Sequence, residues 1–273
     1  STISEWLINY EGGFTKRGLI GQIAIYLSYL IDIKLRLSIF IFQITVIAIY
    51  YLLLDNFISD LKLNNLIIFS IFTPIFILYP VAEIEVLARK ETFLYCFFLL
   101  YLLLNNKTHK NIYKLTILPV AILVWEPVIF FFPFWIIIDF FEQNEKNIIK
   151  SLCNIIIFYL PAIFLAFFIA FNPISSEGHN EMANFLKNEF NEACYMSCEL
   201  LLRKSKITQQ FTAVFDLFTF ERIIRYFLVL LIGFGPLIIL IQYSNFKKLN
   251  AKIISLFVSL PIIVLFLMMT DWG

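Results

Sequence analysis

Long apolar segments alternate with short polar ones along most of this chain. Seven apolar segments predict helices that cross or enter a membrane, namely residues 37–54, 66–81, 92–104, 115–141, 155–171, 226–241 and 253–269. The pattern predicts an all-α, polytopic helical membrane protein. Counting the segment 115–141 as two helices gives about eight transmembrane helices, some short and some long.

The segment 115–141 is too long for one ordinary span and carries Trp125-Glu126-Pro127 near its centre. Pro127 interrupts a helix where a carboxylate sits, so we expect two short helices that meet there. The alternative is a single span, which buries Glu126 in the middle of the membrane and reverses the sides of all later loops.

Two other segments predict helices that do not span. Residues 19–31 are apolar but short, which is typical of a helix lying in the membrane interface. Residues 172–222 form the longest hydrophilic segment, and their middle, about 181–204, predicts a helix. We expect this segment to be a helical loop outside the membrane.

Composition agrees with a membrane protein and excludes a water-soluble one. The chain is 60% hydrophobic and 15% charged, whereas soluble domains carry about 25% charged residues. A net charge of +1 without a basic block gives no reason to expect a nucleic-acid partner. The four cysteines form no metal pattern, and a disulfide between Cys194 and Cys198 requires a break in the predicted helix.

The ends of the sequence suggest a piece of a longer protein. The chain starts at Ser1 without Met and stops at Asp271-Trp272-Gly273, directly after an apolar run. We therefore expect residues 1–273 to form one transmembrane domain that lacks a helix before Ser1 and a C-terminal part.

Threading the predicted spans places the polar segments on two sides. One side holds residues 55–65, 105–114, 139–150 and 242–252, with nine lysines and five acids. The excess of lysine favours this side as cytoplasmic, where lysine serves as a solvated anchor. All six arginines fall on the other side, and arginine is the better residue for oriented phosphate contacts.

The candidate chemistry lies on that second, outer side. The segment 9–18 combines Glu11 with glycines at 12, 13 and 18 and the pair Lys16-Arg17, a set that suits a phosphate-bearing ligand. A turn with interfacial anchors is the alternative. Arg89-Lys90-Glu91 suits a clamp for a phosphate or diphosphate, with Glu91 orienting a divalent cation, or a simple helix cap.

Two further positions complete the candidate set. Glu126 is a carboxylate in an apolar run and needs a partner, either in a functional site or in a structural hydrogen bond. Asp271 and Trp272 follow the last span, where Trp is also common as an interfacial anchor. Ionisable groups close to a membrane are costly, so their gathering at one face is a hypothesis of function.

These motifs resemble a type of bacterial inner-membrane protein of polysaccharide biosynthesis, and the layout is similar to the C-type glycosyltransferase (GT-C) superfamily. The resemblance rests on Tyr10-Glu11-Gly12-Gly13-Phe14 with Lys16-Arg17-Gly18, on Arg89-Lys90-Glu91, on Glu126 before a Phe/Pro-rich helix, and on Asp271-Trp272-Gly273. It departs from the pattern at Trp125, where a His is common, and at Asn9, which stands beside Glu11 in place of a second acid.

The resemblance implies transfer of a sugar from a polyprenyl-phosphate donor to a glycan or lipid acceptor at the outer face of the bacterial inner membrane. Glu11 would be the general base, with Glu126 and Asp271 as further catalytic acids. The donor phosphate would be held by a wider set: Tyr10, Gly12, Gly13, Lys16, Arg17, Arg89, Lys90, Glu91 and Trp272. The only candidate cofactor is a divalent cation. The alternatives are an O-antigen-type polymerase or ligase, a transporter or flippase, and a non-catalytic membrane subunit.

Overall fold

The computed structural model describes most of the first three quarters of the chain. The described residues are 2–59, 89–142, 148–194, 196–199, 201–202 and 219–221, with single positions at 65, 68, 224, 225, 227, 228 and 231. Within them the ordered elements are helices and no strand occurs, which confirms the all-α prediction. Asp271 and Trp272 lie outside the described residues, as do the predicted helices 66–81, 226–241 and 253–269 apart from single positions.

The chain divides into two compact units. The first comprises Ser1–Asp60, Ala88–Ile129 and Asp139–Arg203. The second comprises Leu61–Leu87, Phe130–Ile138 and Lys204–Gly273. The candidate site residues that the structure describes all belong to the first unit.

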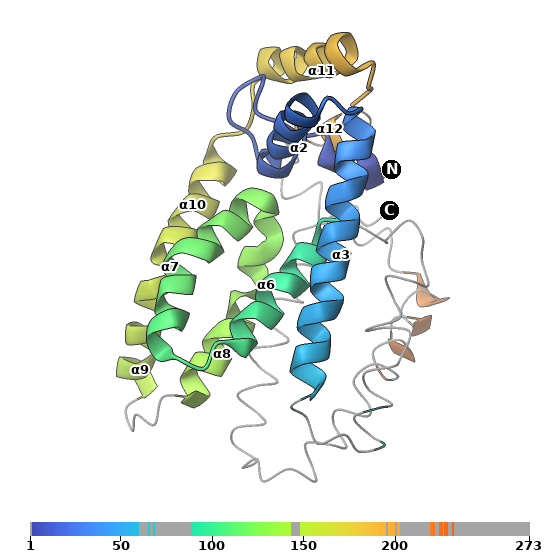
Figure 1. Ribbon diagram of the computed structural model, residues 1–273. Coiled ribbons are helices and arrows are strands. Elements are labelled where there is room, and N and C mark those ends of the chain that lie inside the picture. Colours follow the sequence, from blue (N-terminus) through green and yellow to red (C-terminus); the bar gives the residue numbers. More distant parts are fainter. Residues whose placement is uncertain are drawn as a thin grey trace. The chain divides into compact units, whose positions relative to one another are not determined.

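Most of the described helices belong to the first unit, whereas η1 ends and α8 begins in the second. Figure 1 labels most of the α-helices. The described elements are, in chain order, α1 (Thr2–Trp6), α2 (Gly18–Ile31), α3 (Leu35–Ser59), α6 (Glu91–Leu103), α7 (Lys107–Val124), η1 (Glu126–Phe131), α8 (Phe132–Glu142), α9 (Ile148–Ile156), η2 (Ile157–Tyr159), α10 (Leu160–Phe171), α11 (Ser176–Phe190) and α12 (Met196–Glu199).

Helix α3 contacts other helices of the first unit along its length. It packs against α2 near its start and against α6 further on. The Ser38 hydroxyl of α3 donates to the Ala24 carbonyl of α2 at 2.8 Å, a close contact that two small residues permit. Helix α7 in turn packs against α6 and α10. Helix α2 lies at the end of the first unit where α3 begins and α7 ends (Figure 1).

A buried hydrophobic cluster of the described residues lies at that end. Trp6 of α1 and Ile20 and Ala24 of α2 pack with Val124, the last residue of α7, and with Leu186 of α11. Burying large side chains such as Trp6 contributes about 2–3 kcal/mol each. This packing brings the loop between α1 and α2 close to the start of α6 and the end of α7.

Helix α11 covers the same end with one face. Its buried residues Gly178, Met182 and Leu186 recur every four positions, while Glu177, Glu181 and Glu189 lie exposed. Ser175 caps the helix by accepting a hydrogen bond from the Gly178 amide at 3.0 Å. The helix ends at Phe190, and the following cap residue, Asn191, takes the left-handed conformation common at helix ends.

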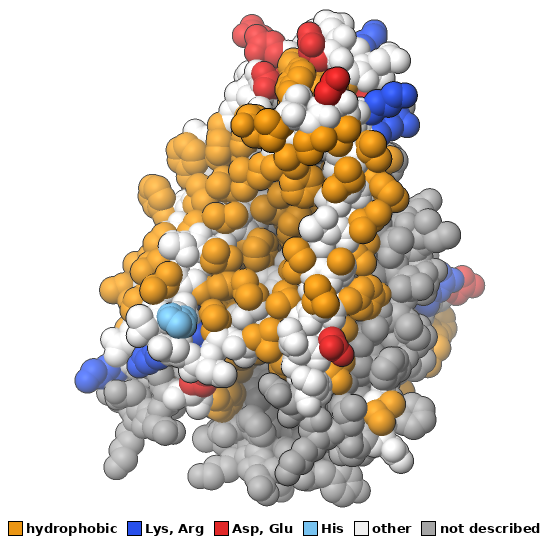
Figure 2. Space-filling model, viewed as in Figure 1, with side chains coloured by type: hydrophobic (Ala, Val, Ile, Leu, Met, Phe, Trp, Pro, Cys, Tyr) orange, Lys and Arg blue, Asp and Glu red, His pale blue; other side chains and the backbone are white. Residues whose placement is uncertain are grey.

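Two described helices, Leu35–Ser59 and Lys150–Phe171, are long and apolar enough to cross a membrane. In their apolar windows 22% and 28% of the residues are buried, whereas the core helix of a soluble protein is mostly buried. Side chains such as Phe164 and Phe171 are about three-quarters exposed. Figure 2 shows the result on one face: a broad hydrophobic band, with acidic and basic side chains beyond its upper end and basic, histidine and a few acidic side chains toward its lower end.

The break within 115–141 is confirmed. α7 ends at Val124, residues Glu126–Phe131 form a 3-10 turn, and α8 begins at Phe132. The alternative of one continuous span is therefore wrong. Proline at 127 starts the new turn because it lacks the amide that a continuing helix would need.

Three predicted boundaries need correction. Residues 107–114, expected in a loop, form the first two turns of α7, because the Asn106 side chain accepts from the Thr108 amide and caps the helix. Asp139 and Glu142, expected in a polar loop, belong to α8. The helix expected at about 181–204 runs instead from Ser176 to Phe190 and is followed by a break.

Candidate functional site

The loop between α1 and α2 is shaped by its glycines. A Cβ at Gly12 would lie 1.7 Å from the carbonyl oxygen of Gly178, so Gly12 allows this loop to pack directly on α11. Gly13 has a φ of +104° and open space beside it. The space that Gly12 provides is therefore filled by the protein itself, and only Gly13 leaves room next to the backbone.

Arg17 ends this loop in an unusual backbone conformation. It has a φ of 62° directly before α2, in the left-handed region that a long side chain rarely adopts. The two other described non-glycine residues with positive φ are Asp32 and Asn191, types that tolerate it. Such a conformation costs about 1–3 kcal/mol and persists only where the surroundings fix it.

Glu126 supplies that fixation through the Arg17 side chain. The Arg17 Nε donates to both carboxylate oxygens of Glu126, at 2.8 and 3.1 Å. Lys16 approaches the same carboxylate at 3.9 Å. The break between α7 and η1 presents Glu126 to this pair, and the two cations hold the pKa of the carboxyl below its ordinary value despite burial.

Lys90 fixes the Arg17 backbone. Its Nζ donates to the Arg17 carbonyl oxygen at 2.7 Å, and the side chain is fully buried at the start of α6. Burial, together with the adjacent Arg17 charge, lowers the pKa of Lys90 to about 7. Lys90 is therefore a cation that changes charge near neutral pH.

Glu5 joins Arg89 and Glu91 to this group. Arg89 lies 3.7 Å from Glu5 and 3.4 Å from Glu91, and the Arg17 guanidinium lies 4.0 Å from Glu5. One carboxylate oxygen each of Glu5 and Glu91 is buried without a hydrogen-bond partner. Burial raises the pKa of Glu91, with the neighbouring Glu5 charge acting in the same direction and Arg89 against it.

We call these residues the ion cluster: Glu5, Lys16, Arg17, Arg89, Lys90, Glu91 and Glu126. Four cations share three carboxylates, and two carboxylate oxygens lack a partner. The side chains of Lys16 and Arg89 are 38% and 41% exposed, so both remain accessible from outside. The cluster can thus accept an anion at these two cations, with Arg17 held behind them by Glu126.

Glu11 lies in the same loop but apart from the ion cluster. It is exposed, its amide donates to the Asn9 side chain at 2.9 Å, and its carboxylate accepts from Gln22 at 3.0 Å. Tyr10 stacks on Phe14, with 5.6 Å between ring centres, and burial raises its pKa to about 12. Among the described residues, no ion pair joins Glu11 to a cation.

The structure thus brings together six of the twelve predicted site residues. Lys16, Arg17, Arg89, Lys90, Glu91 and Glu126 come from three separate segments and meet in the ion cluster. Sequence reasoning missed Glu5 and Gln22. Glu5 could have been found by the criterion that selected Glu126, since it is a lone carboxylate beside apolar residues. Among the described residues, no group of three or more metal-ligand side chains occurs, and the predicted divalent cation stays a prediction.

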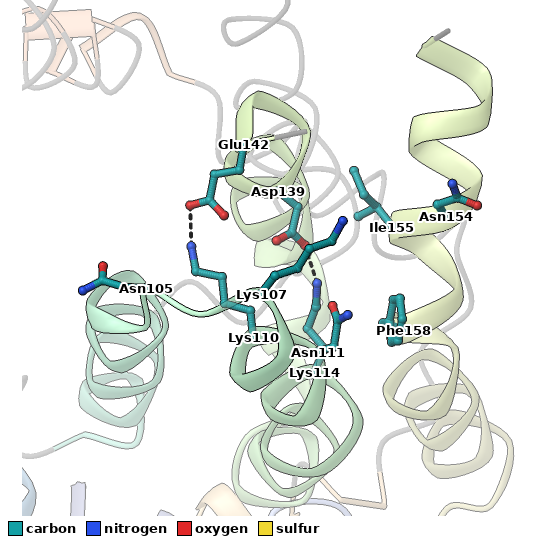
Figure 3. Close-up of a pocket in the computed structure, with 10 residues that line it drawn as sticks. All are labelled: Asn105, Lys107, Lys110, Asn111, Lys114, Asp139, Glu142, Asn154, Ile155 and Phe158. Carbon is teal, nitrogen blue, oxygen red and sulfur yellow. Dashed lines mark hydrogen bonds and ion pairs between the residues drawn. The ribbon is translucent and has the colours of Figure 1, made fainter. Parts of the chain in front are cut away.

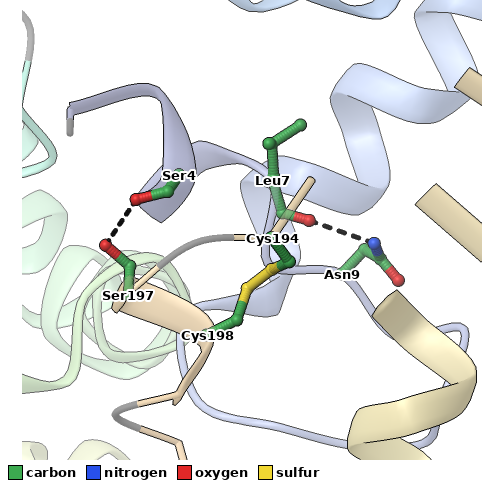
Figure 4. Close-up of a disulfide and its surroundings, with 6 residues drawn as sticks. All are labelled: Ser4, Leu7, Asn9, Cys194, Ser197 and Cys198. Carbon is green, nitrogen blue, oxygen red and sulfur yellow. Dashed lines mark hydrogen bonds between the residues drawn. A yellow bond between two sulfur atoms is a disulfide. The ribbon is translucent and has the colours of Figure 1, made fainter. Parts of the chain in front are cut away.

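A disulfide lies beside this end of the first unit (Figure 4). Cys194 and Cys198 are bonded, with their α-carbons 5.7 Å apart. The break after α11 provides the interruption that the sequence required for this bond. The Ser197 and Ser4 hydroxyls are hydrogen-bonded at 2.7 Å, which ties α12 to α1, the helix of Glu5.

No protein-family model, no curated protein and no solved structure matches this chain.

Proposed function

We propose that the protein is a membrane glycosyltransferase that moves a sugar from a polyprenyl-phosphate donor to a glycan or lipid acceptor. The observation that carries this proposal is the ion cluster, where two accessible cations lie next to a less exposed arginine, Arg17, at one end of a group of apolar helices. A lipid-linked phosphate combines the apolar tail that exposed helix faces accept with the anion that this cluster accepts.

The disulfide supports placing this end of the protein outside the cytosol. Disulfides persist in oxidising compartments such as the bacterial periplasm and are rare in the reducing cytosol. Cys194 and Cys198 lie beside α1, and therefore beside the ion cluster. We infer a multi-pass protein of the bacterial inner membrane with the ion cluster at its outer face.

In the proposed reaction the chain supplies a base and a set of cations. Glu11 takes the proton of the acceptor hydroxyl, whose oxygen then forms a bond to the anomeric carbon of the sugar. The bond between that carbon and the phosphate oxygen breaks, and the polyprenyl phosphate leaves with an added negative charge. Lys16 and Arg89 stabilise that charge, and Glu126 positions Arg17.

The test is sugar transfer by the purified full-length protein. A polyprenyl-phosphate hexose and a short oligosaccharide acceptor are supplied, and both the elongated glycan and the released polyprenyl phosphate are measured. Glu11→Gln should abolish transfer without changing the unfolding midpoint, because Glu11 is exposed. The matched control is Glu181→Gln, an exposed acid on α11 that should leave transfer unchanged.

Three results would contradict the proposal. Equal transfer by wild type and Glu11→Gln removes Glu11 as the base. If the wild-type protein moves the donor across a vesicle membrane without breaking the sugar–phosphate bond, it is a transporter. If it neither transfers the sugar nor moves the donor, it is not a transferase.

A further inference from the structure

A second polar site lies at the opposite end of α7 from the ion cluster (Figure 3). It is a cavity of about 760 Å³, and the residues that line it include four charged or amide side chains of α7 and two acids of α8. Helix α9 and the following 3-10 turn close it with Asn154, Ile155 and Phe158. A cavity with this many charged and amide groups suits a polar ligand.

One face of α7 supplies the cations. Lys107, Lys110, Asn111 and Lys114 are spaced by three or four residues, so they form one stripe along the helix. Lys110 and Lys114 are nearly buried, with side chains 6% and 4% exposed. These two lysines are therefore not the solvated anchors that the sequence suggested.

Asp139 neutralises Lys114 and fixes the back of the cavity. Its carboxylate accepts from Lys114 at 2.9 Å, from the Tyr159 hydroxyl at 2.9 Å and from the Tyr101 hydroxyl. We call these four residues the Asp139 network. It joins α6, α7, α8 and η2, and its charges are balanced within the protein.

Lys110 is also paired, but with a more accessible partner. It donates to Glu142, whose side chain is 52% exposed, and its ammonium lies 5.1 Å from the centre of the Tyr101 ring. Glu142 and Asp139 thus form ion pairs with two of the three lysines that line the cavity.

Lys107 is the third lysine that lines the cavity. It is exposed, and within the described residues it forms no ion pair. In Figure 3 its side chain extends over the cavity between α7 and α9, with no interaction drawn to it. The amide side chains of Asn111 and Asn154 line the same space and can donate to an oxyanion.

We propose that this cavity binds a phosphate group carrying net negative charge, with Lys107 as its cation and Asn111 and Asn154 as amide donors. Lysine is a common phosphate ligand, and basic pockets between membrane helices bind anionic headgroups. The phosphate comes either from a lipid headgroup or from a soluble phosphate. Helix α7 has 18 residues, so its two ends lie about 27 Å apart. The cavity is therefore separate from the ion cluster.

The test measures ligand retention by the purified full-length protein in native mass spectrometry. The probes are inorganic phosphate, dioctanoyl phosphatidic acid and dioctanoyl phosphatidylcholine. We expect Lys107→Gln to weaken binding of the charged probe about tenfold or more, since one charge-assisted hydrogen bond is lost. Asn154→Ala should weaken it less. Lys187→Gln on α11, also without an ion pair in the described part of the chain, should change nothing.

Each outcome bears on the proposal. Binding of inorganic phosphate that Lys107→Gln weakens identifies a soluble source, and binding of phosphatidic acid alone that Lys107→Gln weakens identifies a lipid. The proposal is overturned if phosphatidylcholine binds as tightly as phosphatidic acid, if no charged probe binds, or if Lys107→Gln and Lys187→Gln bind alike. Lys107 is exposed, so its variant should keep the wild-type unfolding midpoint and a folding defect would be recognised there.

Discussion

The two ends of α7 carry buried charges that are organised differently. In the Asp139 network, one carboxylate receives three donors and the one lysine it contains is paired. In the ion cluster, four cations share three carboxylates, and Glu5 and Glu91 each keep a buried oxygen without a partner. A satisfied buried network holds helices together, whereas a partly satisfied one is costly to stability. The difference supports a structural role for the first and agrees with the donor binding that we propose for the second.

The largest expected effect is loss of the Asp139 charge. Asp139→Asn leaves Lys114 charged and buried without its ion pair, which should lower the free energy of unfolding by about 3–5 kcal/mol. Glu181→Gln is the control, because Glu181 is exposed on α11 and the change should cost at most about 0.5 kcal/mol. Thermal unfolding in detergent measures both. Similar losses for the two variants would show that the Asp139 network is no more structural than an exposed carboxylate.

The accessibility of Cys194 and Cys198 to labelling tests on which side of the membrane the ion cluster lies. On intact cells, a membrane-impermeant maleimide should label Cys194 and Cys198 only after an impermeant reductant has opened their bond. Reduction should also lower the free energy of unfolding by about 2 kcal/mol, as expected for a short closed loop. Cys153→Ser, at an exposed free cysteine, is the control. Labelling without any reductant would place free thiols there and remove the argument for an oxidising side.

A smaller effect is expected from the titration of Lys90. As the pH rises, activity should fall and stability should increase. Lys90 is protonated below pH 7, so kcat/KM for an anionic donor should fall about fivefold between pH 7 and 8. In the unfolded chain lysine keeps its proton up to about pH 10.4. The unfolded state then binds more protons between pH 7 and 10.4, and stability should rise with pH across that window. Both trends should vanish in Lys90→Met, and a wild-type pH profile in that variant would rule out Lys90 as their origin.

Much of the fold was predictable because apolar length and proline position are local signals. The helices at 18–31, 35–59 and 91–103 and the break at Glu126 follow from such signals. The start of α7 was missed because its lysines look like loop residues, although Asn106 is a good helix cap and the lysines share one helix face. Asp139 was missed because it was assigned to a loop, although it is a lone carboxylate after an apolar run.

The candidate site was predictable as a set of residues but not as a geometry. Motif composition selected Lys16, Arg17, Lys90 and Glu126, and the structure brings them together. No local signal reveals that Arg17 adopts a left-handed backbone or that Lys90 binds its carbonyl, because both depend on packing between distant segments. The same packing uses Gly12 for contact with α11, a purpose that the sequence motif does not reveal.

The most direct test of the ion cluster as the donor site is a dissociation constant. Binding of a polyprenyl-phosphate hexose is measured for the wild type, for the double variant Lys16→Gln/Arg89→Gln, and for Lys107→Gln at the other end of α7. We expect the double variant to lose about a hundredfold in affinity, because two charge-assisted contacts are removed, and Lys107→Gln to bind as tightly as the wild type. An unchanged dissociation constant in the double variant, or an equal loss in Lys107→Gln, would contradict the assignment of the donor phosphate to the ion cluster.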